Sequence, residues 1–156
     1  MNDMLLNLMH HMRWADALVA DALDHPATNP DVIGLFAHIA AVEHLWYARI
    51  HERAPTVAVW PTLAAAEARA LAATHADLFE EIARAATDAS LARRVRYRNS
   101  AGREFDSSVE DIMTHVAMHG SHHRGQILQR LRASGREPPY VDFIQFMRRD
   151  QIEQIR

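Results

Sequence analysis

Four histidines lie within the segment HVAMHGSHHRGQI, which covers residues 115–127. His119 and His123 are four residues apart, so on a helix their rings lie on the same face, one turn apart. Neutral imidazoles in this arrangement can share a transition-metal ion, but two histidines do not complete a protein metal site. The same spacing also suits solvated or hydrogen-bonded histidines, so the sequence raises the question of a third ligand.

A second apolar-periodic segment, residues 31–53, contains the candidates for that third ligand. At ~100° per residue, His38 borders the apolar stripe of this segment, whereas His44 and His51 point away from it. In the segment that follows Ser108, His123 lies about 40° and His119 about 80° from the centre of the apolar stripe. The periodicity therefore selects His38, His119 and His123, with one or more coordination positions left for water, and it leaves a metal-free reading open.

Two acidic residues also project inward. Asp16 lies within about 40° of the centre of the first apolar stripe, and Glu43 lies toward the inner margin of the second. A buried carboxylate is costly unless it is paired. Asp16 could orient a ligand histidine or form an ion pair with an arginine, and Glu43 raises the same question.

Several classes of metalloprotein do not fit these residues. Gly120 follows His119, where the zincin motif H-E-x-x-H has its glutamate. The Glu-x-x-His pairs of di-iron bundles are absent, because Glu43 is followed by Trp46 and Glu110 by Met113. The chain has no cysteine, which excludes thiolate ligands and a cysteine nucleophile. The nitrogen-rich donor set suits Zn, Ni, Fe or Cu better than Mg or Ca.

The elements that must position these residues are mostly helical. Long helices are predicted at about 3–24, 31–53, 63–86 and 108–134, with Thr62 capping the third, and Ser107 with Glu110 capping the fourth. Residues 93–108 predict a short β-hairpin, because Val95 and Tyr97 alternate with arginines before an NSAG turn. A short helix starts at about Asp142. We therefore expect one all-α domain over residues 1–156, a four-helix bundle with a short hairpin before helix four and a short C-terminal helix.

Composition narrows the class of protein further. The chain has 156 residues, of which 49% are hydrophobic and 24% charged, as in ordinary soluble domains. Its net charge of −3 argues against general nucleic-acid binding, and no apolar run reaches the ~20 residues that span a membrane. The N-terminal segment lacks the pattern of a signal peptide, so a cytoplasmic location is expected. Since there is no lysine, Schiff-base chemistry on lysine is excluded.

Four stretches of the chain resemble the DinB/YfiT-like superfamily. MRWADALVADAL (12–23) is similar to the first helix of that family, which often reads W-A-N where this chain has Asp16 third. LFAHIAAVEHLWYARI (35–50) resembles its second-helix motif, whose first histidine falls on His38. HVAMHGSHHRGQI resembles the family signature ending in H-x-x-x-H-R-G-Q, and PPYVDFIQFMR (138–148) is also similar.

The resemblance implies an up-down-down-up four-helix bundle, a divalent metal ion held by His38, His119 and His123, and a homodimer. Zn²⁺ or Ni²⁺ is expected, with Fe, Mn or Cu as alternatives. By resemblance the protein is a metal-dependent thiol S-transferase or hydrolase that acts on a small molecule with a low-molecular-weight thiol. Asp16 and His115 are candidate catalytic bases. The alternative is a non-catalytic metal-binding protein associated with damage or stress.

Overall fold

Residues 2–150 are described by the structure, a computed structural model, and they form six helices and one two-stranded sheet. The elements in chain order are α1 (Asn2–Leu23), α2 (Pro30–Ile50), α3 (Ala65–Ala85), α4 (Asp88–Ala92), β1 (Arg94–Arg98), β2 (Glu104–Ser108), α5 (Val109–Ala133) and α6 (Phe143–Met147). The predicted all-α class is confirmed, and the hairpin and the C-terminal helix are present. The short helix α4 is not predicted, because five residues are too few to display a helical period.

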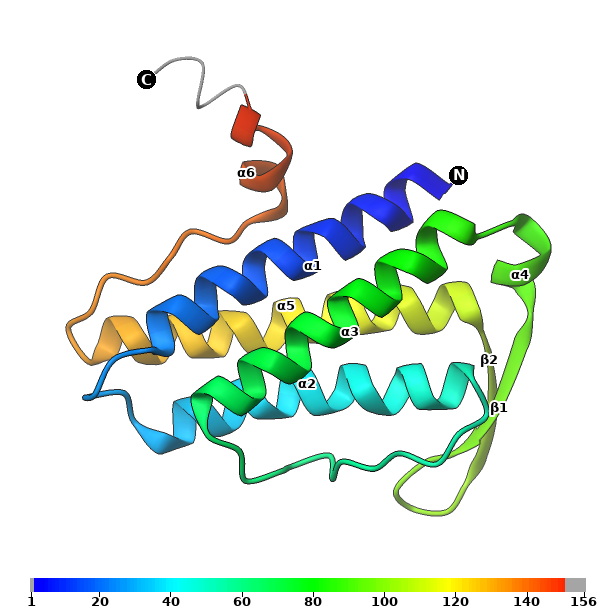
Figure 1. Ribbon diagram of the computed structural model, residues 1–156, viewed down its shortest axis with the longest axis horizontal. Helices are drawn as coiled ribbons and strands as arrows, with labels where there is room; N and C mark the ends of the chain where they lie inside the picture. Colours follow the sequence, from blue (N-terminus) through cyan, green and yellow to red (C-terminus); the bar gives the residue numbers. More distant parts are fainter. Residues whose placement is uncertain (1, 151–156) are drawn as a thin grey trace.

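The four long helices contact one another in a ring: α1 packs against α3 and α5, and α2 packs against the same two helices. Figure 1 shows that α1 and α5 run in one direction along the long axis, whereas α2 and α3 run in the other. The connection from α2 to α3 therefore returns along the length of α2 (Figure 1). This connection, residues 51–64, lies beside the helix that carries His38.

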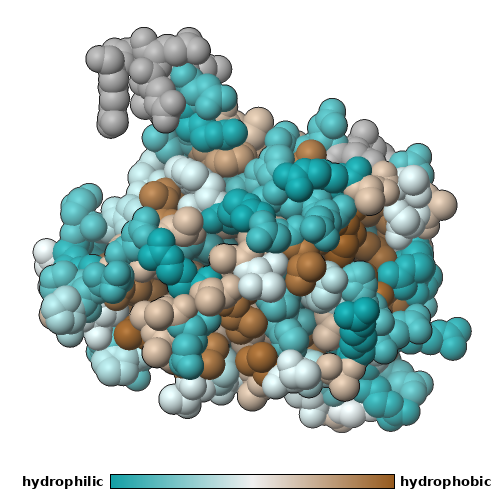
Figure 2. Space-filling view, in the orientation of Figure 1, coloured by the Kyte–Doolittle hydropathy of each residue, from teal (hydrophilic) through white to brown (hydrophobic). Residues whose placement is uncertain are grey.

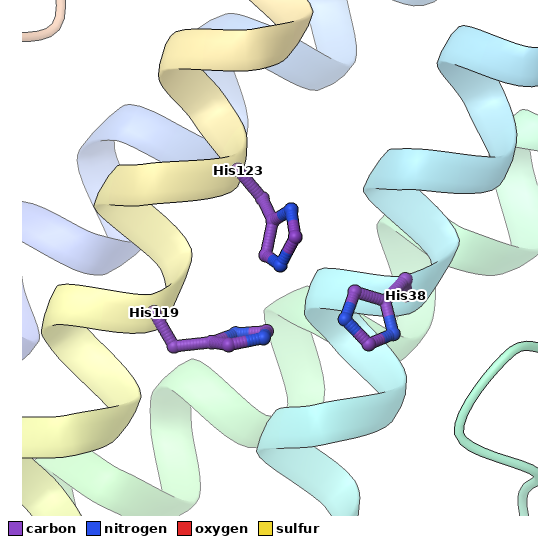
Figure 3. Close-up of side chains that lie close together, drawn as sticks. All are labelled: His38, His119 and His123. Atoms are coloured by element: carbon purple, nitrogen blue, oxygen red, sulfur yellow. The ribbon is translucent and has the colours of Figure 1, made fainter.

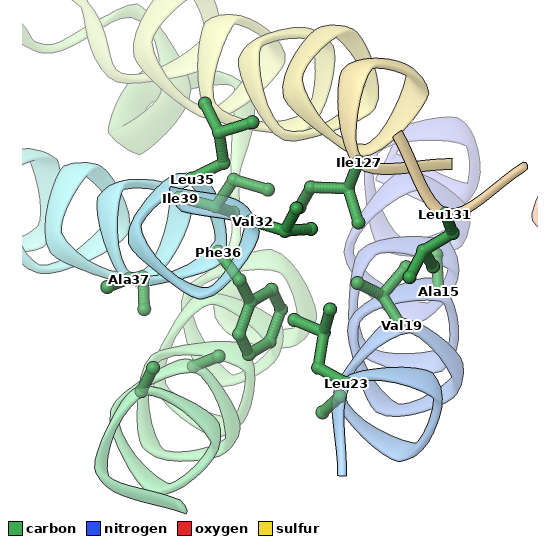
Figure 4. Packing of buried hydrophobic residues seen from close by; sticks show 14 of the residues in the cluster. Ala15, Val19, Leu23, Val32, Leu35, Phe36, Ala37, Ile39, Ile127 and Leu131 are labelled. Atoms are coloured by element: carbon green, nitrogen blue, oxygen red, sulfur yellow. The ribbon is translucent and has the colours of Figure 1, made fainter. Parts of the chain in front are cut away.

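Two clusters of buried apolar side chains fill the space between the long helices. One cluster includes Val19, Leu23, Phe36, Ile127 and Leu131 (Figure 4). The other includes Met9, Met12, Phe79, Ile112 and Met113. Burying one such large side chain contributes about 1.5–3 kcal/mol. Both α2 and α5 contribute to these clusters, so packing fixes the two helices that carry the candidate ligands.

Side-chain caps determine where the helices start. Asn29 accepts a hydrogen bond from the backbone N–H of Asp31 and caps α2, and Pro30 occupies the first helical position. The predicted cap at Thr62 is wrong. The third long helix begins after Ala64, because the Glu67 carboxylate accepts the backbone N–H of Ala64 at 2.8 Å.

The predicted capping box of α5 is shifted by one residue. Ser107 pairs with Val95 in the sheet, so it is not available as a cap. Ser108 is the N-cap instead: its hydroxyl accepts the N–H of Asp111, and the Asp111 carboxylate accepts the N–H of Ser108. Gly135 follows the end of α5 with a φ of +82°, a left-handed conformation that glycine adopts without steric cost.

The surface combines hydrophilic and apolar residues. On the face shown in Figure 2, hydrophilic residues surround separate apolar patches. Across residues 2–150, no helix combines the length and the apolar character that crossing a membrane requires.

Candidate metal centre

Three imidazole rings converge between α2 and α5. His38 of α2, and His119 and His123 of α5, each offer one ring nitrogen, and these three atoms all lie within 4.8 Å of one another. The ring centroids are 4.5–5.0 Å apart, and the rings point toward one another (Figure 3). His38 is buried, whereas the other two are half-buried. The structure therefore brings together the three histidines that the sequence selects.

The orientation of His38 is fixed by the connection between α2 and α3. Its Nδ1–H donates to the backbone carbonyl of Val59 at 2.8 Å. The indole of Trp60 stacks on the same ring at 3.6 Å between centroids, with only 3° between the planes. Because Nδ1 carries the proton, Nε2 keeps its lone pair for a ligand bond.

A second hydrogen bond orients His123 in the same way. Its Nδ1–H donates to the side-chain Oε1 of Gln126 at 2.8 Å. The Gln126 amide nitrogen in turn donates to Nε2 of His122 at 3.2 Å, which fixes the direction of the amide. Nε2 of His123 therefore also keeps its lone pair. Metal-binding histidines commonly donate their other ring N–H to such an acceptor.

The electrostatic environment favours the neutral form of the His119 and His38 imidazoles. Burial, followed by the neighbouring His123 and His38, lowers the pKa of His119 from 6.5 to about 3. Burial also lowers the pKa of His38. Neutral imidazole is the form that binds a metal ion. Within the described part of the chain, the candidate donor set consists of three imidazole nitrogens and includes no carboxylate. Such a set suits Zn²⁺, Ni²⁺ and other divalent transition metals.

Asp16 lies in the interior as the partner of an arginine. Its Oδ1 accepts a hydrogen bond from Nη1 of Arg124 at 2.9 Å, and both side chains are almost completely buried. No contact within residues 2–150 joins Asp16 to the three imidazoles. Of the two roles that the sequence leaves open for Asp16, the arginine pair is the one observed.

Glu43 completes this interior cluster, which we call the Arg124 cluster (Asp16, Glu43 and Arg124). Burial, and then the charge of Asp16, raise the pKa of Glu43 well above its usual value. Burial also raises the pKa of Asp16, although Arg124 opposes that shift. The raised pKa favours the protonated form of Glu43, which leaves Asp16 as the carboxylate that pairs with the guanidinium. Both oxygens of Glu43, Oδ2 of Asp16, and Nε and Nη2 of Arg124 are buried without a hydrogen-bond partner in the described residues.

Gly120 makes room for the Arg124 guanidinium. A Cβ atom at Gly120 would lie 2.7 Å from Nη1 of Arg124, well inside a normal contact. Gly125, on the same helix, has open space at the corresponding position. Gly120, which lies between the two candidate ligands of α5, therefore provides the space that the buried guanidinium occupies.

The remaining histidines on these helices have other partners. His115 is exposed, one turn before His119, with its ring 5.7 Å from that of His119 and 5.3 Å from Trp46. His44 accepts the backbone N–H of Thr56 through Nε2 and contacts His75 through Nδ1 at 3.2 Å. His44 thus ties the α2–α3 connection down at a second point.

The sequence does not predict the roles of Val59, Trp60 and Gln126. Gln126 belongs to the signature segment and lies three residues after His123, and this helical spacing is the signal that could have linked the two side chains. Val59 acts through its backbone carbonyl, which any residue offers. Trp60 lies in a connection with two prolines and no helical period, so only its size and its 63% exposure single it out.

A mostly helical scaffold with three inward imidazoles on neighbouring helices defines a class of protein with a candidate histidine metal centre. Comparison with protein-family models matches residues 5–154 to the DinB family. Since this match covers nearly the whole chain, the protein belongs to the DinB family. Neither the curated proteins nor the solved structures give a significant match.

Proposed function

We propose that the protein is a divalent-metal-dependent enzyme, a thiol S-transferase or hydrolase acting on a small molecule. The up-down-down-up bundle of the family would be its scaffold. The observation that carries the proposal is the matched orientation of His38 and His123, whose Nδ1–H groups are both engaged by protein oxygens at 2.8 Å. Their free Nε2 atoms have no other partner in the described residues, and a metal ion would complete them.

A divalent ion held there supplies a positive charge that lowers the pKa of a bound thiol or water and favours its nucleophilic form. The protein residues contribute position and access. Val59 and Gln126 hold two of the rings, and the Trp60 indole covers one side of His38. The thiol would come from a cosubstrate, since the chain has no cysteine.

Access to the site favours an enzyme over the non-catalytic alternative. His119 and His123 are half-buried rather than sealed, and the Trp60 indole that stacks on His38 is 63% exposed. A purely structural metal site is normally closed by protein ligands, whereas a catalytic one keeps a position for substrate. Three histidines leave such a position.

Elemental analysis of the purified and zinc-reconstituted protein tests the proposal. We expect about one equivalent of metal in the wild type. The control His25→Ala removes an exposed histidine outside the site and should bind the same amount. His123→Ala and His119→Ala should lose the metal. The loaded protein is then assayed with thiol cosubstrates and a chromogenic aryl halide, and separately with an aryl ester. Unchanged metal content in His123→Ala would overturn the ligand assignment. Metal binding without turnover on either substrate class would favour the non-catalytic alternative.

A further inference from the structure

A cation without a carboxylate partner lies beyond the histidine site on the seam of α2 and α5. Arg49 is half-buried, and its guanidinium carbon lies 4.5 Å from the ring centroid of Trp46 and 4.6 Å from that of Tyr97. Its one hydrogen bond in residues 2–150 runs from Nη2 to the backbone carbonyl of Arg98 at 2.8 Å. No carboxylate of those residues forms an ion pair with it, so its charge is not neutralised within the described chain.

The neighbouring arginines of the hairpin are different. Arg94 pairs with Asp106, and Arg98 pairs with Glu104, both across the two strands. Arg96 lies between them on the outward face of β1 and is exposed to water. Arg93 also has no ion pair among the described residues and donates to the Ile50 carbonyl, but it is exposed. Arg49 differs from these arginines because it is half-buried, has no ion pair and is oriented by two aromatic rings and a carbonyl. An unpaired, partly desolvated guanidinium is a ready site for an anion.

A continuous row of side chains joins Arg49 to the metal centre. Trp46 contacts the His115 ring at 5.3 Å, and His115 is 5.7 Å from His119, one of the three candidate ligands. Along α2, Arg49 lies 11 residues after His38, about 16 Å along the helix axis. The reach of the arginine side chain shortens this separation, so an extended small molecule can touch both ends of the row.

We propose that Arg49 is a specificity-determining residue that binds an anionic group, a carboxylate or a phosphate, at the end of the substrate remote from the metal. This inference rests on the proposed function. It narrows the substrate class to extended small molecules that carry the reacting thiol or electrophile at one end and the anion at the other. Trp46 and Tyr97 hold the guanidinium in place, and the exposed His115 lies along the path between the two ends.

The experiment uses the cobalt-loaded protein and thiol probes whose binding is followed by the thiolate-to-cobalt absorption band. Mercaptoundecanoate is compared with mercaptoundecanol, and mercaptoacetate with mercaptoethanol as a pair too short to reach Arg49. We expect the long carboxylate to bind about tenfold more tightly than the long alcohol, the size of one charge-assisted contact. The short pair should show no such advantage.

Two variants test the residue itself. In Arg49→Gln the advantage of the long carboxylate should disappear while metal content and the binding of mercaptoundecanol stay unchanged. Arg96→Gln, an exposed arginine on the same hairpin, is the matched control and should keep the advantage. An advantage that survives in Arg49→Gln, or that is equal for short and long pairs, would overturn the inference.

A second arm needs no metal and separates this inference from the proposed function. The Nε–H resonance of Arg49 is followed in the metal-free protein during titration with octanoate, octyl phosphate and octanol. We expect one or both anions, and not octanol, to shift it, and the stronger of the two names the anion. If anions shift the Arg49 resonance but the protein binds no metal, the proposed function is wrong and the anion site stands. If the protein binds metal but neither anion shifts the Arg49 resonance, the anion site is wrong and the proposed function stands.

Discussion

The Arg124 cluster and the three-histidine group are both polar clusters in a helical protein, and they differ in their burial and in what they offer to a ligand. Arg124, Asp16 and Glu43 have exposed fractions of 1%, 4% and 1%, and the charge of Arg124 is compensated inside the fold by its ion pair with Asp16. Five other polar atoms of these side chains are buried without a hydrogen-bond partner in the described residues. In the histidine group, the outer nitrogens of His38 and His123 are bonded to the protein, and the inner ones have no partner within residues 2–150.

This difference separates a structural cluster from a candidate site. A buried ion pair compensates its charge inside the fold, and its burial closes it to ligands from outside. A set of lone pairs that face one another, by contrast, is completed by an ion or a ligand. His123 and Arg124 are consecutive residues, yet they belong to different clusters. This is possible because consecutive side chains on a helix point about 100° apart.

The largest expected effect comes from removing the centre of the Arg124 cluster. Arg124→Ala leaves a cavity and a buried carboxylate without its cation, so the free energy of unfolding should fall by about 3–5 kcal/mol. His119→Ala should cost the metal-free protein no more than about 1 kcal/mol, since it removes a half-buried side chain with no hydrogen bond to lose. Urea unfolding of both variants without metal measures this. The comparison fails if the two variants lose similar stability.

The next effect concerns the orientation of a ligand. Gln126→Ala removes the acceptor of the His123 Nδ1–H, so metal affinity should fall by about 10–100-fold while the fold is retained. Gln129→Ala, an exposed glutamine one turn further along α5, is the control and should bind as the wild type does. Competition with a chromogenic zinc chelator measures both affinities. Equal affinities in the two variants would mean that Gln126 does not orient His123.

Two glycine variants of α5 should change stability in opposite directions. Gly120→Ala pushes a methyl group against the Arg124 guanidinium and should cost about 1–3 kcal/mol. Gly125→Ala meets open space and should gain up to about 1 kcal/mol from its higher helix propensity. Thermal and urea unfolding measure both changes. A stabilising Gly120→Ala would show that the arginine is not held as tightly as its burial indicates.

The smallest effect is a dependence on pH. Glu43 keeps its proton in the folded protein and loses it more readily when unfolded, because burial raises its folded pKa. Its contribution to stability is therefore full below its unfolded pKa of about 4.5 and is lost as the pH rises toward the folded pKa. Glu43→Gln removes this titration, so its stability relative to wild type should rise with pH, by at most about 1.4 kcal/mol per pH unit. Urea unfolding between pH 4 and pH 8 measures the difference, and parallel curves would contradict a protonated Glu43.

Much of this architecture could be predicted from the sequence, because long apolar periods determine helices and the faces they bury. The ends of the four long helices lie within a few residues of the predicted positions, and the inward direction of His38, His119 and His123 follows from the same wheel. Helix starts are less predictable. At α3 the competition between Thr62 and Ala64 as caps is decided by the reach of Glu67.

The contributions of irregular segments could not be predicted. A wheel places residues on a helix but says nothing about where a connection runs, so the carbonyl of Val59 and the ring of Trp60 have no signal in the sequence. The partner of Asp16 is a similar case. The wheel places Arg124 on the inner side of its helix, but only the structure shows that the space left by Gly120 admits its guanidinium beside Asp16.

The return path of the α2–α3 connection also sets a minimum length for that segment. Since α2 has 21 residues, the connection must cover about 31 Å, which takes at least about nine fully extended residues. Residues 51–64 therefore hold only about five residues of slack, and that slack lets Trp60 settle against His38. A deletion of up to about five residues would use up this slack and pull the indole off the imidazole, which would reshape the mouth of the site while the helices stayed in place. A longer deletion would have to unwind the end of a helix.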